Sequence, residues 1–147
     1  MPISPSFFCK DMLQIKHLLP AAMLLLASCA SHRSAYQLSG EWNVVNLNGT
    51  EIVPSKQTPY LGFDINENLI YGFTGCNRLT GRLDAAQFLK GKAEIGTLGM
   101  TRMLCQDDQY ETPFMECLGK VAASEIKDNM MFLKDKDGKT LITLKKK

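Results

Sequence analysis

An apolar run near the N-terminus limits which residues of this chain can belong to a folded domain. The run, residues 18–28, is 11 residues long and is preceded by Lys10 and Lys16. A helix needs about 20 apolar residues to cross a bilayer, so this run is too short to span one. A short apolar run behind a positively charged start is typical of a secretory signal peptide. We therefore expect the fold to lie in the residues that follow it.

The end of the apolar run predicts a lipid anchor. Leu26-Ala27-Ser28-Cys29 resembles the bacterial lipobox, in which a cysteine after one aliphatic and two small residues receives a thioether-linked diacylglycerol. Ala30 stands where an Asp would favour retention in the inner membrane. We therefore predict lipidation of Cys29 and a periplasm-facing location on the bacterial outer membrane. The alternative interpretation is a buried helix of a cytosolic domain that happens to end in cysteine.

These features divide the chain into three parts. Residues 1–28 are predicted to be the lipoprotein signal peptide, residues 29–39 a lipidated tether and residues 40–147 a single domain. Within the signal peptide, residues 1–11 are unusually long for a start region and contain Pro2 and Pro5. Residues 12–17 make a more ordinary start, so residues 1–11 are interpreted as a mis-assigned extension.

Three of the five cysteines lie in the predicted domain. An exported protein meets an oxidising compartment, where disulfides form. Cys76 and Cys105 lie in turn-like or strand-end segments, whereas Cys117 lies on a predicted helix beside its apolar face. A Cys76–Cys105 disulfide is preferred, and the alternatives are the other two pairings or three reduced thiols.

The domain pattern predicts many short strands and one late helix. Residues 40–47 alternate between apolar and polar side chains, and Asn48-Gly49 is a strong hairpin signal. The spacing of Tyr110, Phe114, Leu118 and Val121 predicts a helix over 108–123. We expect an α+β fold: a small, strongly bent antiparallel β-sheet that closes into a conical barrel-like domain, with one helix in its C-terminal half.

Several motifs of the domain resemble those of the META domain (HslJ-like) family of bacterial lipoproteins and secreted proteins. The resemblance is carried, in order, by Gly40-x-Trp42, Gly75-Cys76-Asn77, Thr101-x-Met103-x-Cys105 and Glu111-x-x-Phe114. It implies a compact barrel-like domain with one helix and an association with envelope stress or drug tolerance. It also implies that Cys76 and Cys105 are the paired cysteines, and it implies no established enzyme activity.

The residue inventory argues against catalysis. Arg78 beside Cys76 would activate a thiol, but the chain's two histidines, His17 and His32, lie in the signal peptide and the tether. The cysteine spacing fits no zinc site, and residues 72–77 lack the Gly-Lys-Ser/Thr ending of a phosphate loop. A net charge of +2 is too small for a nucleic-acid binder. We predict a non-enzyme without cofactor or metal.

Two functions remain as hypotheses. The first is a lipid-anchored, monomeric interaction module for an envelope protein partner; a lysozyme-inhibitor-like role is a third, less favoured alternative. The second is a binder of a small hydrophobic ligand or acyl chain in the mouth of the barrel. The candidate pocket consists of Phe63, Phe73, Met103 and Phe132, with Met100, Met130 and Met131 as further lining. A core filled by these same side chains is the competing interpretation.

Overall fold

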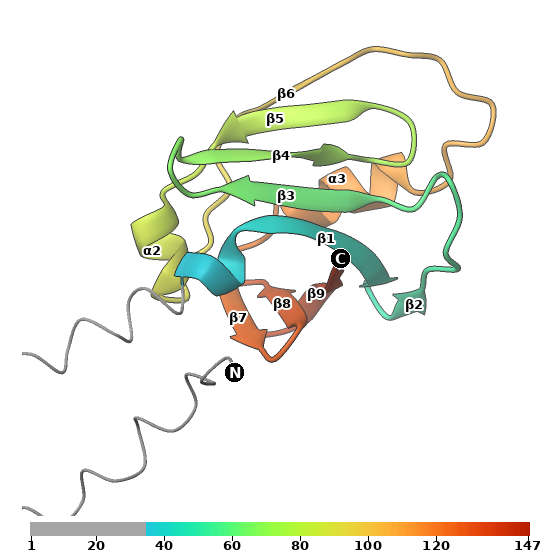
Figure 1. Cartoon of the computed structure of the whole chain (residues 1–147). Coiled ribbons are helices and arrows are strands. Elements are labelled where there is room, and N and C mark those ends of the chain that lie inside the picture. Colours follow the sequence, from blue (N-terminus) through green and yellow to red (C-terminus); the bar gives the residue numbers. More distant parts are fainter. Residues whose placement is uncertain (1–34) are drawn as a thin grey trace, which may run out of the picture.

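A computed structural model describes residues 35–147, and these form one antiparallel sheet with short helices (Figure 1). The signal peptide, Met12 and Cys29 lie outside the described residues. Among the helices of the described part, none is long and apolar enough to cross a membrane. The strands are β1 (Gly40–Leu47), β2 (Thr50–Glu51), β3 (Tyr60–Asp64), β4 (Leu69–Phe73), β5 (Arg78–Arg82), β6 (Leu98–Met100), β7 (Ala123–Lys127), β8 (Met130–Lys134) and β9 (Thr140–Lys146).

The sheet is strongly bent but open, so the predicted closure into a barrel is wrong. The strand order within residues 35–147 is β6-β5-β4-β3-β1-β9-β8-β7, with β2 paired to β1, and the two end strands do not pair with each other. The turn after α2 (Ala85–Leu89) covers the β7 edge instead. There the Ala93 amide donates to Ala122 O, and the Ser124 amide donates to Gly91 O. An edge protected by a turn needs no ring closure.

The predicted hairpin turn is confirmed, whereas the predicted helix differs in its bounds. Asn48 and Gly49 both have positive φ, as a two-residue hairpin turn requires, so that prediction is confirmed. The C-terminal helix, α3 (Glu111–Leu118), is shorter than the predicted span of 108–123. Phe88 lies in α2, which begins where the Asp84 carboxylate accepts from the Gln87 backbone amide.

The concave side of the sheet is a filled apolar core. Helix α3 packs over this side against β1 and β9, and it buries Phe114, Cys117 and Leu118 (Figure 1). Phe63 of β3 meets Phe88 of α2 with the ring centroids 5.2 Å apart. In the described structure the buried apolar side chains all lie between residues 38 and 144, so residues 35–147 contain this whole core.

A helical turn at residues 35–38 belongs to the packed domain. Leu38 is fully buried, and the Trp42 indole Nε1 donates to its carbonyl at 2.9 Å. The Lys146 ammonium donates to the carbonyls of Tyr36 and Gln37, at 3.2 and 2.7 Å. The domain therefore starts before Gly40, and the last part of the predicted 29–39 tether is not free chain.

Candidate functional site

The turn between β4 and β5 (residues 74–77) is the centre of the family motifs. Gly75 has φ +105°, and a Cβ there would lie 3.1 Å from the Gln57 carbonyl, so both conformation and space favour glycine. The Thr74 hydroxyl accepts from the Asn77 amide at 2.8 Å and closes the turn. The turn thereby fixes the direction of Asn77, which is almost fully buried.

Glu111, the first residue of α3, binds this turn from the other side. Its carboxylate accepts from the Thr74 hydroxyl, from the Asn77 amide at 3.1 Å and from Asn77 Nδ2 at 3.0 Å. Burial raises the pKa of Glu111, but the hydrogen bonds from Thr74 and Asn77 outweigh it and hold the pKa below its usual value. The carboxylate is therefore an ionised structural acceptor.

The side-chain oxygen of Asn77 binds the segment after β6. Asn77 Oδ1 accepts from the Thr101 hydroxyl at 2.9 Å and from the Met103 amide at 2.7 Å. The disulfide Cys76–Cys105, with a Cα–Cα distance of 5.9 Å, ties the same two segments, so the preferred pairing is confirmed. We call Thr74–Asn77, Thr101–Cys105 and Glu111 the motif clasp. It joins three segments that are far apart in sequence.

The motif clasp has few side-chain groups free to take part in a reaction. Cys76 is bound in the disulfide, and every buried side-chain nitrogen or oxygen in residues 35–147 has a hydrogen-bond partner. Cys117 is a buried free thiol whose pKa is raised by burial. Within the described residues no group of His, Cys, Asp and Glu could hold a metal ion. Trp42, another motif residue, lies in the core rather than in the clasp.

The four candidate pocket residues do not come together. Phe63 is buried in the core, while Phe73 lies on the outer face, 6.2 Å from the Tyr60 ring. Met103 is 62% exposed. In β8 the neighbours Met131 and Leu133 are buried, so Phe132 faces outward. The interior pocket built from these residues is therefore wrong, because strand alternation sends two of them outward and packing fills the interior.

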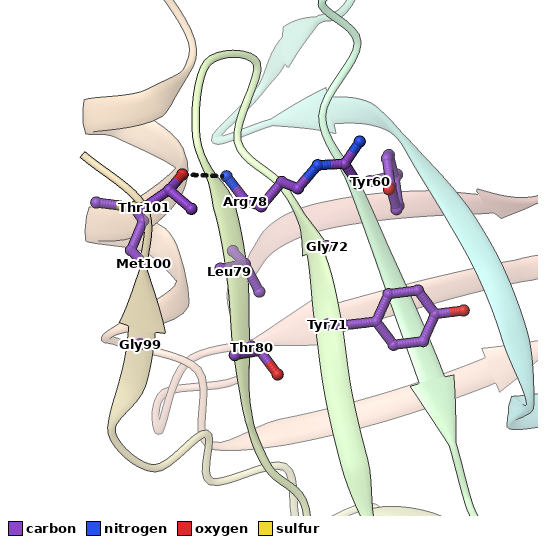
Figure 2. A pocket seen from close by; sticks show the side chains of 9 residues that line it. All are labelled: Tyr60, Tyr71, Gly72, Arg78, Leu79, Thr80, Gly99, Met100 and Thr101. Atoms are coloured by element: carbon purple, nitrogen blue, oxygen red, sulfur yellow. Dashed lines mark hydrogen bonds between the residues drawn. The ribbon is translucent and has the colours of Figure 1, made fainter. Parts of the chain in front are cut away.

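A hollow exists instead on the outer face of β3–β6, shown in Figure 2. It has a volume of about 460 Å³, and we call it the outer hollow. It is lined by residues of strands β3–β6 and the position after β6: Tyr60, Tyr71, Gly72, Arg78, Leu79, Thr80, Gly99, Met100 and Thr101.

Register explains why this face is hollow. Gly62, Tyr71, Thr80 and Gly99 lie in one row across four strands. Gly99 leaves one end of the row without a side chain, and the Tyr71 ring lies over Gly62, where a Cβ would clash with it. In the neighbouring row the Arg78 side chain extends toward Tyr60 (Figure 2). The alternation of side chains along each strand could be predicted from the sequence, but the pairing of residues between strands could not.

The rim of the outer hollow carries opposite charges. Burial raises the pKa of Tyr71, and the nearby Glu41 adds to this effect. The Lys147 ammonium lies 4.2 Å from the centroid of the Tyr60 ring and 2.6 Å from the Glu41 carboxylate. Arg78 is exposed and has no ion pair among the described residues. The hollow thus offers aromatic surface beside a free guanidinium.

The clasp and the sheet together correspond to a known domain. The META domain family model matches residues 36–147. The chain belongs to the META domain family. The match covers the whole packed unit, including the helical turn at residues 35–38 from its second residue onward. The comparison with curated proteins found no match.

Two solved structures resemble this META domain. One, described as an NMR structure of a protein, has a TM-score of 0.56 and 26% identity, covering 76% of this chain and 92% of that one. The other is a crystal structure of a DUF4847 family protein from Bacteroides vulgatus, with a TM-score of 0.53 and 16% identity over 78% and 97%. The second shows the fold alone. The aligned regions make up nearly all of both neighbours, so a similar fold occurs in chains with little beyond it.

Proposed function

We propose that this protein is a lipid-anchored, non-catalytic binding module of the bacterial outer membrane, facing the periplasm and acting in envelope stress or drug tolerance. The observation that carries the binding role is the outer hollow, where Tyr60, Tyr71 and Arg78 are presented on strands rather than on mobile loops. Sites on strands hold their side chains in fixed positions.

The location rests on the lipobox-like sequence that ends in Cys29. The non-catalytic role is supported by the motif clasp, whose polar groups are bound to one another. Asn77 alone makes contacts with Glu111, Thr101 and Met103. A residue that is fully engaged in this way stabilises a loop and has no free group to offer a substrate.

The outer hollow also favours a second candidate, the binding of a small hydrophobic ligand. Its volume of about 460 Å³ lies within the usual range for small-molecule sites of roughly 300–1,000 Å³. A planar or acyl group would lie on the Tyr71 ring, with an acceptor group toward Arg78. This replaces the barrel mouth as the place where such a ligand would bind.

Site-specific photo-crosslinking in intact cells tests the binding role. A benzophenone amino acid replaces Thr80, at the outer hollow, and in a matched variant it replaces Lys136, in the β8–β9 turn. We expect adducts from position 80 that are absent from position 136. Adducts of a protein partner support the interaction module, and a small mass increment supports the hydrophobic ligand. Equal labelling at both positions, or none at position 80, would overturn the assignment of this face.

A further inference from the structure

A second hollow on the outer face of the sheet is basic. It lies between β1, the loop after β2 and the end of β9, and it has a volume of about 540 Å³. Four lysines belong to its lining: Lys56, Lys145, Lys146 and Lys147. We call this hollow, together with these lysines, the basic groove. Tyr60 lines both this groove and the outer hollow, so the two are neighbours.

The charge of the basic groove is only partly balanced. Lys147 pairs with the Glu41 carboxylate, and Lys146 turns to the concave side, where it donates to the carbonyls of Tyr36 and Gln37. Lys56 and Lys145 are exposed, and no carboxylate side chain among residues 35–147 lies within ion-pair distance of either. The groove therefore has uncompensated positive charge, which favours an anionic occupant.

The floor of the groove is apolar. Ile52 is buried and Pro54 lies beside it, and the Tyr60 and Phe73 rings meet at 6.2 Å on the outer face. Lysine stems lie readily along such surface while their ammonium groups stay in water. Positive charge next to an apolar floor matches an amphiphile with an anionic headgroup better than it matches a simple inorganic ion.

The groove also lies near the point where the chain leaves the domain. The lysine run 145–147 lies at the end of β9, and Lys146 binds the helical turn at residues 35–38 directly. Cys29 precedes Ala35 by about six residues, which span at most about 20 Å when extended. A lipid on Cys29 would thus keep the groove close to a membrane surface; this step alone rests on the proposed function.

We propose that the basic groove binds the phosphate headgroups of anionic membrane lipids and seats the domain against the membrane. Lys56 and Lys145 supply the charge, and the floor at Ile52, Pro54 and Phe73 contacts the glycerol and upper acyl region. Docking by charge and a lipid anchor together gives firmer attachment than either alone.

Vesicle co-sedimentation of the fragment 35–147 tests the proposal, because this fragment contains the complete core and lacks Cys29. The probes are phosphatidylcholine vesicles with and without phosphatidylglycerol. The test variant is Lys56→Glu with Lys145→Glu. The matched control is Lys136→Glu with Lys139→Glu, which reverses the same number of charges in the exposed β8–β9 turn.

We expect salt-sensitive binding that requires phosphatidylglycerol. Each lysine near an anionic surface contributes roughly fivefold to the partition coefficient, so the groove variant should bind about 25-fold less well or weaker. The control variant should lose much less. Absence of binding to phosphatidylglycerol vesicles, or an equal loss in both variants, would overturn the proposal. Binding of soluble glycerol phosphate without binding of vesicles would also overturn it, because the source would then be a free phosphate ester.

The outcome is independent of the anchor. The fragment has no lipobox cysteine, so vesicle binding succeeds or fails whether or not Cys29 is lipidated in cells. Release of the full chain from membranes by a Cys29 substitution tests the anchor separately. A failed groove with an intact anchor, and the reverse, are therefore distinguishable results.

Discussion

Removal of the Asn77 side chain should strongly destabilise this META domain. The side-chain nitrogen Nδ2 donates to Glu111 Oε1 and Oε2, both at 3.0 Å, and to the Met103 carbonyl at 3.3 Å. Its oxygen accepts from the Thr101 hydroxyl and the Met103 amide. The substitution Asn77→Ala removes all of these bonds and leaves the groups at both ends with fewer partners.

The size of the stability loss follows from the hydrogen-bonding groups that lose Asn77 as a partner. A hydrogen bond to an ionised group contributes about 1.5–3 kcal/mol, and a buried donor or acceptor without a partner costs about 1–3 kcal/mol. Glu111 keeps its bonds from the Thr74 hydroxyl and from the backbone amide of residue 77, and water reaches the partly exposed side of the clasp. We therefore expect Asn77→Ala to lower the free energy of unfolding by about 3–4 kcal/mol.

Urea unfolding of the oxidised fragment 35–147, followed by Trp42 fluorescence, measures this loss. The control is Asn66→Ala, because Asn66 lies exposed in the β3–β4 turn and should change stability by less than about 0.5 kcal/mol. A double-mutant cycle with Glu111→Ala should show coupling above about 1 kcal/mol. If Asn77→Ala and Asn66→Ala cost the same, or if the cycle is additive, the clasp does not hold the domain together.

Three further predictions concern the disulfide, the ionised carboxylate and the anchor. Cys76→Ser, Cys105→Ser and the double variant should each lose about the same stability, about 3–4 kcal/mol on the loop-entropy model, in urea unfolding; additive losses would contradict a shared bond. Because the folded-state pKa of Glu111 is lowered, its stabilisation is complete above the unfolded-state pKa and is lost as pH falls through the folded value. Wild type should therefore lose more stability than Glu111→Gln between neutral and acidic pH, and parallel urea profiles would refute this. Cys29→Ala should release the protein from membrane fractions, and a variant that still sediments as an acylated species would exclude this anchor.

Local signals in the sequence predicted the local structure well. Alternation over residues 40–47 identified β1, and Asn48-Gly49 identified its hairpin, because both depend on neighbouring residues. The helix was placed correctly by Phe114 and Leu118, although it begins at Glu111, and its N-cap, Tyr110, makes no side-chain capping bond.

Features that depend on register or long-range pairing could not be predicted. The open sheet follows from the absence of pairing between β6 and β7, which no local pattern encodes. The outer hollow arises because Gly62 pairs with Tyr71 across β3 and β4. The motif clasp brings Asn77 to Glu111, and only the family resemblance marked both residues beforehand.

The position of β9 affects when this domain can fold. The last strand of the chain lies inside the sheet, between β1 and β8, rather than at an edge. Until residues 140–146 have emerged, β1 with β2–β6 and β7 with β8 are two separate half-sheets that lack their common partner. Closing this pairing joins the two ends of the domain, which is the slow, non-local kind of step in folding. A chain built in this way cannot complete its sheet until its last strand is available.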